Sequence, residues 1–320
     1  MFQLVFSLLD MPPQCHKYNI ILRNMFLPYA SRQRHAIWLS SNSAYRYRMM
    51  SSSGTSAYPH IAIVGSGPSG FYTAKYLLDR HPSIHVDLLE KLPVPYGLVR
   101  YGVAPDHPEV KNVIATFNEV AKNERFRFFG NIELTKDVAQ PLHRSPSQQH
   151  IANQIDVSTL QAKYSGVVLA CGAEEDLSLD IANEDSAGVL SARSFVNWYN
   201  GHPDYTHIGD RFDLSKITDV VIIGQGNVAV DCARILCKDM YDLERTDITL
   251  QAVEKLKNSR VKNVTMIGRR GAVQSSFTIK ELRELTKLSC QEHKHHVNIV
   301  ISEEDMQQSL NVASLKVCMR

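Results

Sequence analysis

Two glycine-rich turns, each preceded by a short apolar run, constrain the fold of this 320-residue chain more than any other feature. The first reads GSGPSG at 65–70, between the apolar run HIAIV and a helical pattern. The second reads GQGNVA at 224–229, between DVVII and another helical pattern. A strand, a tight glycine turn and a helix in this order are typical of a dinucleotide-binding unit. We therefore predict an α/β fold with two Rossmann-like dinucleotide-binding domains.

Hydrophobic periodicity extends both units beyond their turns. In the first unit it predicts strands at 60–65, 85–90, 126–129, 132–134 and 164–170, with helices at 71–80 and 109–122. After a linker near 176–188, it predicts strands at 219–224 and 261–268 and helices at 228–240 and 278–288. The polar stretch 140–154 contains two prolines and is predicted to be a surface insertion. The expected domains are 57–177 and 178–289, followed by a divergent tail at 290–320.

The N-terminal segment 1–56 differs in composition from the rest of the chain. It holds six basic residues and one acid, Asp10, whereas the remainder holds 29 basic and 32 acidic residues. A segment rich in Arg and Ser and poor in acids is typical of a mitochondrial transit peptide, although a disordered extension without a targeting role has the same composition. In either case we expect residues 1–56 to be disordered. Its apolar run Phe2–Leu9 is too short to cross a bilayer. The slightly acidic remainder also lacks the basic field of a nucleic-acid-binding protein, so we expect no nucleic-acid partner.

The first glycine turn carries the residues expected to hold a pyrophosphate. Gly65 permits the tight turn, Gly67 lets the backbone approach the phosphates, and Gly70 lets the helix pack against the strand. Glu90 ends the next predicted strand, where a carboxylate can accept hydrogen bonds from the ribose hydroxyls. The alternative is a tight glycine turn in an unrelated α/β domain.

The second turn is followed by a different pair of side chains. Arg269 and Arg270 come after the next predicted strand, in the place where a carboxylate would repel a 2′-phosphate. Two charge-assisted hydrogen bonds of about 1.5–3 kcal/mol each would favour NADPH over NADH by on the order of a hundredfold or more. A solvated basic turn is the alternative interpretation. Two such sites in one chain indicate a flavin and a nicotinamide nucleotide that meet end to end.

Cysteine usage separates this chain from flavoenzymes that reduce disulfides. Six cysteines are scattered, with no CxxC pair and none between residues 84 and 125. Cys232 and Cys237 lie on the predicted helix after the second turn and point in different directions, so we expect both to be core residues. Without a redox dithiol, electrons would have to leave the flavin for an external acceptor. No metal site is predicted, and we interpret the tail histidines 293, 295 and 296 as solvated.

The string PYGLVRYGVAPDHPEVK at 95–111 resembles the adrenodoxin-type ferredoxin–NADP reductases. The stretches IGQGNVAVDCAR at 223–234, LERTDI at 243–248, GRRG at 268–271 and FTIKELR at 277–283 are similar to the same family. The likeness runs from about residue 60 to 288, apart from the polar insertion. It implies an enzyme that carries electrons from NADPH through FAD to a [2Fe-2S] ferredoxin such as adrenodoxin, in support of mitochondrial P450 enzymes or iron–sulfur cluster assembly.

The resemblance also implies which residues contact each cofactor. The FAD contacts would add Ser69, Leu98 and Leu134 to the glycines and Glu90, and the NADP(H) contacts would be Gln225, Gly226, Asn227, Val228, Arg269, Arg270 and Glu281. His107 lies in a segment that runs close to the flavin in the family, and we expect it to tune or shield the ring system rather than act as an obligate base. A loop histidine held by packing is its alternative. Arg283 could belong to a basic patch for an acidic ferredoxin, or be an ordinary exposed arginine.

Beyond about residue 288 the likeness ends. The family continues with a segment that returns to the flavin domain and carries a Trp-x-x-x-Gly-Pro-x-Gly stretch, and neither Trp38 nor Trp198 has that context. We therefore expect an incomplete flavin domain, and a catalytically impaired, nucleotide-binding form is a second hypothesis. A third is an electron-input module like the glutamate synthase small subunit. The expected location is the mitochondrial matrix, with a peripheral position on the inner membrane as the alternative, and no transmembrane segment is expected.

Overall fold

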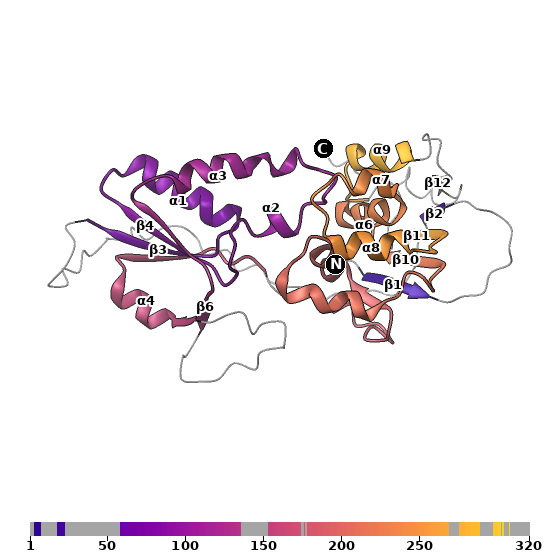
Figure 1. Ribbon diagram of the computed structural model, residues 1–320, viewed down its shortest axis with the longest axis horizontal. Coiled ribbons are helices and arrows are strands. Elements are labelled where there is room, and N and C mark those ends of the chain that lie inside the picture. Colours follow the sequence, from indigo (N-terminus) through magenta and orange to yellow (C-terminus); the bar gives the residue numbers. More distant parts are fainter. Residues whose placement is uncertain are drawn as a thin grey trace.

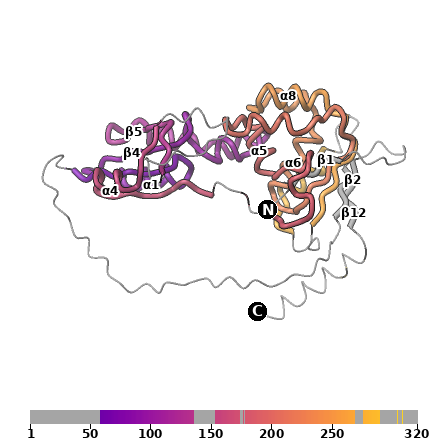
Figure 2. Tube along the Cα trace, turned by 90° about the horizontal axis from the view of Figure 1, so that it is seen from below, coloured from indigo at the N-terminus to yellow at the C-terminus, as the bar shows by residue number. Residues whose placement is uncertain are grey.

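The computed structural model describes residues 3–7, 18–22, 58–135, 153–173, 176, 178–268, 275–288, 297–301, 303 and 307. These residues form two α/β units that lie side by side along the long axis of the molecule (Figure 1 and Figure 2). The first unit comprises residues 58–173, and the second comprises residues 189–288 together with short strands from both ends of the chain. Among the described residues, no helix has the length and apolar character needed to cross a bilayer.

The first unit is built on a parallel four-stranded sheet in the order β5-β4-β3-β8. Ile63 in the central strand lies opposite Leu88 of β4 and Val168 of β8. A shorter parallel pair, β6–β7, adjoins this sheet. The bounds are β3 (His60–Val64), β4 (His85–Leu89), β5 (Phe126–Phe129), β6 (Ile132–Thr135), β7 (Asn153–Asp156) and β8 (Gly166–Leu169).

Helices cover both faces of this sheet because β3 alternates its side chains between two apolar cores. Ile63 packs with Phe71 and Phe117 under α1 (Pro68–Arg80) and α3 (Val113–Ala121). Ala62 packs on the other face with Leu160 of α4 (Val157–Lys163). Two short elements, α2 (Leu98–Tyr101) and η1 (Val110–Asn112), precede α3, and α2 lies between the two units (Figure 1). This alternation is what a strand buried on both faces requires.

The second unit places β10 (Asp219–Ile223) parallel to β11 (Asn263–Ile267). Its core contains the aromatic side chains of α5 (Ala192–Tyr199) and the apolar face of α6 (Asn227–Cys237). The remaining elements are β9 (Val189–Ser191), η3 (Pro203–Arg211), α7 (Met240–Leu243), α8 (Leu250–Lys257) and α9 (Ile279–Lys287).

Two strands come from the segment that was expected to lack structure. β1 (Gln3–Ser7) lies antiparallel between β9 and β10, and β2 (Tyr18–Leu22) pairs in parallel with β12 (Val297–Ile301). The expectation of disorder over 1–56 is therefore wrong for these ten residues. Free strand edges of the second unit accept them as partners. The transit peptide stays a prediction, and the rest of the segment lies outside the described residues.

Most predicted elements are present, with shifted ends. The helix predicted at 228–240 ends at Cys237 because Lys238 is extended and Asp239 begins a new helix, accepting a hydrogen bond from the Tyr241 amide. The helix predicted at 109–122 starts at Val113, after a 3₁₀ turn. The surface insertion predicted at 140–154 is too long, because residues 153 and 154 belong to β7, and the part at 140–152 lies outside the described residues.

Candidate functional site

The first glycine turn connects β3 to α1, and two of its three glycines are required by close packing. Gly65 has φ +104°, and a Cβ there would lie 2.4 Å from the carbonyl oxygen of Ala170. A Cβ on Gly70 would lie 2.0 Å from the carbonyl oxygen of Gly65. Gly67 differs, because a Cβ there would meet no atom within 4 Å. The backbone at Gly67 therefore faces open space, as a turn that admits a pyrophosphate must.

The carboxylate of Glu90 is held beside this turn by three donors. Its Oε2 accepts hydrogen bonds from the backbone N–H of Ser66 at 2.9 Å and from the Ser66 hydroxyl at 2.6 Å. Its Oε1 accepts one from the Leu92 amide at 3.1 Å. The carboxylate is thus oriented before any ligand arrives, which reduces the entropy lost on binding. Gly67 caps α1 without a side-chain hydrogen bond, so the positive end of the helix remains available to an anion.

A pocket of about 940 Å³ opens beside the turn. The residues predicted for the flavin site that line it are Gly65, Gly67, Ser69, Glu90, Leu98 and Leu134, whereas Gly70 is buried in the first turn of α1, against the Gly65 carbonyl. The second unit contributes Arg193, Asn197, His202, Asp204, Tyr205 and His207 to the same pocket. The sequence analysis missed these six residues, because they carry no motif and reach the pocket only when the α5–η3 region folds against the first unit.

The second turn has a similar geometry, but its third fingerprint position has room for a side chain. Gly224 has φ +136°, and Gly226 caps α6 without a side-chain hydrogen bond. The third position is Ala229, which is fully buried and has room for its Cβ. Val228 is partly exposed at the start of the helix.

Residues of the second turn also hold the segment that leads into α9. The Asn227 side-chain oxygen accepts a hydrogen bond from the Thr278 amide at 2.8 Å, and the Gln225 carbonyl oxygen accepts one from the Ser276 amide at 3.0 Å. The Gln225 side chain covers Gly268, where a Cβ would lie 2.3 Å from its Cδ. Arg269 and Arg270 lie outside the described residues, so their predicted contact with a 2′-phosphate stays a prediction.

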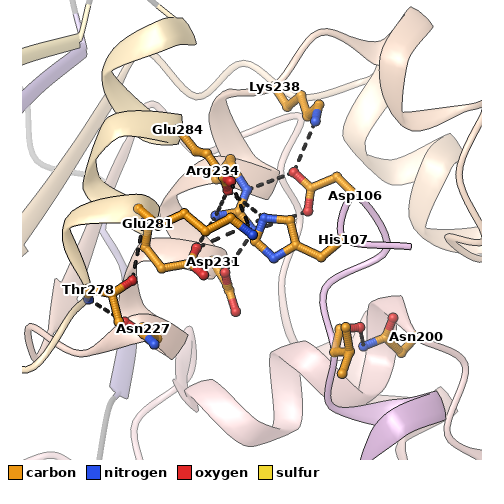
Figure 3. Close-up of polar contacts among 12 residues, drawn as sticks. Asp106, His107, Asn200, Asn227, Asp231, Arg234, Lys238, Thr278, Glu281 and Glu284 are labelled. Atoms are coloured by element: carbon orange, nitrogen blue, oxygen red, sulfur yellow. Dashed lines mark hydrogen bonds and ion pairs between the residues drawn. The ribbon is translucent and has the colours of Figure 1, made fainter. Parts of the chain in front are cut away.

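A buried group of charges lies where the two units meet (Figure 3). His107, from the loop after α2, places its Nε2 2.5 Å from Oε2 of Glu284 and 4.0 Å from Oε2 of Glu281. Arg234 of α6 contacts Glu281 at 3.0 Å. The structure thus brings two predicted residues, His107 and Glu281, within one polar cluster, but His107 does not line the pocket beside the first turn. Arg234 ends the quoted string 223–234 and Glu284 directly follows the string 277–283, although the sequence analysis gave neither a role.

The pKa values of the two aspartates that contact Arg234 are shifted in opposite directions. Burial by itself would raise the pKa of Asp106, but hydrogen bonds and charge from Arg234 and Lys238 lower it to about 2. Burial raises the pKa of Asp231, and the attraction of Arg234 only partly opposes this shift. The pKa of Arg234 is raised despite burial, because Asp106 and Asp231 stabilise its charge. The guanidinium therefore stays charged throughout the accessible pH range.

His107, Glu281 and Glu284 also have the composition of a metal site, since their ligand atoms lie within 4.8 Å of one another. The guanidinium of Arg234 already lies 3.0 Å from Glu281 and 3.9 Å from Glu284. A divalent ion would have to displace this cation or bear its repulsion. We therefore assign the positive charge at this position to Arg234.

The described cysteines do not form a redox pair. Cys232 and Cys237 are buried, as predicted, and burial raises the pKa of both thiols, that of Cys237 to about 12. Thiols that remain protonated are poor nucleophiles and poor redox groups. Cys171 is exposed at the edge of the pocket and has no described cysteine beside it.

The profile of the pyridine nucleotide-disulphide oxidoreductases matches residues 59–309. This chain belongs to that family. It is 52% identical over 230 residues to the mitochondrial NADPH:adrenodoxin oxidoreductase of Bos taurus, covering 72% of this chain and 43% of the relative. It is 48% identical over 234 residues to the enzyme of the same name from Arabidopsis thaliana, covering 73% of this chain and 44% of the relative. The chain thus spans less than half the length of these curated relatives.

A solved structure shares the fold. Mycobacterium tuberculosis FprA in complex with NADPH aligns with a TM-score of 0.64 and 42% sequence identity, covering 72% of this chain and 48% of that chain. The predicted fold class and the resemblance of the sequence to the adrenodoxin-type reductases are therefore confirmed. The family profile is named for disulphide chemistry, but the three cysteines within the described residues do not supply the dithiol that such chemistry needs.

Proposed function

We propose that this chain binds FAD and NADP(H) and belongs to the electron path from NADPH through FAD to an adrenodoxin-type [2Fe-2S] ferredoxin. The observation that carries the proposal is the presence of two glycine turns of the same geometry in one chain, in adjoining units. The names of the relatives, NADPH:adrenodoxin oxidoreductase, support the same chemistry.

The residues present fit the phosphate and ribose parts of a dinucleotide at the first turn. The open space at Gly67 leaves room for a pyrophosphate, and the N-terminus of α1 offers it unpaired N–H groups. Glu90, already oriented, would accept hydrogen bonds from the ribose hydroxyls. When bound, FAD supplies the conversion of a two-electron donor into single electrons for an iron–sulfur partner.

The second turn would hold the phosphates of NADP(H) on the N-terminus of α6. Arg269 and Arg270 would bind the 2′-phosphate and select NADP(H) over NAD(H). Glu281 and His107, in the junction between the units, would lie near the nicotinamide and flavin ends that must meet there. Their task would be orientation, because hydride transfer needs aligned reactants more than a proton carrier.

The partner and location follow from the same proposal. An acidic [2Fe-2S] ferredoxin would dock on the enzyme, and Arg283, which is exposed on α9, is a candidate contact. The curated relatives are named mitochondrial, and the basic, acid-poor segment 1–56 supports import. We infer a location in the mitochondrial matrix, at the surface of the inner membrane.

The experiment is to purify the full chain and measure bound flavin by its visible absorbance, then NADPH-driven reduction of a [2Fe-2S] ferredoxin. Glu90→Gln, which keeps the shape of the side chain and removes its charge, should lower the flavin content. Stoichiometric flavin with ferredoxin reduction supports the full proposal. Nucleotide binding without turnover would favour the second hypothesis, a nucleotide-binding form that does not turn over. Failure to bind either nucleotide would refute both.

A further inference from the structure

Three elements from different parts of the chain converge on one guanidinium. Asp106 lies in the loop after α2 of the first unit, Asp231 and Arg234 lie one turn apart on α6, and Glu281 lies in the first turn of α9 (Figure 3). Asp106 and Arg234 are 128 residues apart in the sequence. The contact between them is therefore made by tertiary folding alone.

Arg234 donates four hydrogen bonds to three carboxylates. Its Nε and Nη2 bond the two oxygens of Asp106 at 2.7 and 3.1 Å. Its Nη2 also bonds Asp231 at 2.7 Å, and its Nη1 bonds Glu281 at 3.0 Å. A planar guanidinium can serve three acceptors in fixed directions, whereas a lysine ammonium has no such fork.

Because the Asp106–Arg234 ion pair is buried, breaking it carries a large energetic cost. The side chains of Arg234 and Asp106 are each only 2% exposed, so neither charge can be satisfied by water if the other is removed. Lys238 adds a contact to Asp106 at 3.0 Å from the same side. An unpaired buried charge is far more costly than an unpaired surface charge.

Several other polar contacts between the units also fall on residues 98–112, and they are more exposed than Asp106–Arg234. Lys280 contacts Glu109 at 3.0 Å with both side chains more than half exposed. Lys111 contacts Asp247, whose side chain is 60% exposed. Asn200 donates from Nδ2 to the carbonyl oxygens of Tyr101 and Val103 at 3.0 and 3.1 Å. Asp106–Arg234 is the buried centre of this set within the described residues.

We propose that Arg234 is a positioning residue that clasps the first unit to the second through Asp106 and thereby sets Glu281 and His107 in the junction. Because Arg234 holds Asp106 next to His107 and also holds Glu281, moving the guanidinium moves both sides of the junction together. The role toward a nucleotide rests on the proposed function, whereas the clasp itself does not.

Zero-length carbodiimide cross-linking of the full chain tests the clasp directly. The reagent condenses a lysine amine with a neighbouring carboxylate, so it records pairs that are already in contact. Lys280–Glu109 and Lys111–Asp247 join the two units, while Lys257–Glu244, at 2.5 Å, lies within the second unit and is the internal reference. Peptide mass spectrometry gives the yield of each pair.

Arg234→Lys keeps the charge and removes the fork. We expect the yields of both inter-unit pairs to fall several-fold relative to the internal reference. Arg260→Lys is the matched control, because Arg260 is exposed on the second unit and is not next in sequence to any of the cross-linked carboxylates, so all three yields should be unchanged. Wild-type inter-unit yields in a folded Arg234→Lys protein would overturn the proposal.

Asp106→Asn tests the other side of the clasp if Arg234→Lys does not fold, as judged by loss of the internal cross-link. It should also lower the inter-unit yields, and unchanged yields would overturn the proposal in the same way. NADPH affinity, measured by titration on the same variants, separates the clasp itself from its proposed role in nucleotide binding. If the cross-links fall and the wild-type chain binds no NADPH, the proposed function fails and the clasp stands.

Discussion

The two glycine turns share a backbone geometry but differ in what they tolerate. Both begin with a glycine at positive φ, Gly65 at +104° and Gly224 at +136°, and both cap their helix with a glycine that makes no side-chain bond. In the first unit the helix crosses so close to the turn that Gly70 has no room for a Cβ, whereas Ala229 carries one in the second unit. The residue type at the third position of the fingerprint therefore depends on the distance between the helix and the turn, and not on which ligand the turn binds.

Changing that third position should give the largest effect. Gly70→Ala places a Cβ against the Gly65 carbonyl oxygen, and we expect a loss of about 3 kcal/mol in the free energy of unfolding, at the high end of overpacking costs. Ala229→Gly is the matched change, and it should cost only about 1 kcal/mol through helix propensity. Denaturant unfolding of both variants measures the difference. Equal costs would mean that the two helices pack at similar distances.

The two units also differ in the side chains that follow their next strand, Glu90 in the first and the arginine pair in the second. Replacing Arg269 and Arg270 together with Ala should reduce the preference for NADPH over NADH by about a hundredfold. The reason is the loss of two charge-assisted hydrogen bonds to the 2′-phosphate. Titration with each nucleotide gives the ratio, with Glu90→Gln as a control that should leave it unchanged. An unaltered ratio of NADPH to NADH affinity would show that Arg269 and Arg270 form a solvated basic turn instead.

Each unit supplies one aspartate to Arg234, and the two should respond differently. Because the pKa of Asp106 is lowered from 3.8 to about 2, its contribution to stability is present above about pH 4 and is lost as the pH falls towards 2. We expect Asp106→Asn to cost about 2 kcal/mol at pH 7 and to flatten the acid limb of the stability curve. Asp231→Asn should cost less, since burial raises the pKa of that carboxyl. Unfolding curves between pH 2 and 7 would contradict this if Asp231→Asn were the costlier change.

Gly67→Ala should have the smallest effect on stability and still impair the site. A Cβ at this position meets nothing within 4 Å, so the free energy of unfolding should change by less than about 0.5 kcal/mol. The methyl group would project into the space left for the pyrophosphate, so flavin binding should weaken. Flavin content and an unfolding curve on the same sample test both statements. Normal flavin content would show that the phosphates lie elsewhere.

Much of the fold could be predicted from the local sequence pattern. The exact ends of helices and the strands that pair only with distant parts of the chain could not. The strands at 60–64, 85–89 and 219–223 and their helices follow from apolar periodicity beside glycine turns. The break at Lys238 was missed because a favourable cap on Asp239 competes with continuation of the helix. The strands β1 and β2 were missed because their pairing depends on distant edges rather than on their own sequence.

The sequence by itself determined where the backbone must turn and which helix ends can receive phosphate. Those properties depend on residues within a few positions of one another, where missing Cβ atoms and the order strand–turn–helix decide the geometry. Only the tertiary structure decided that Asn197 and Asp204 reach the pocket of the first unit and that Arg234 pairs with Asp106. These contacts join residues far apart in the chain, and the free energy that selects them arises from burying charges and apolar surface together when the two units meet.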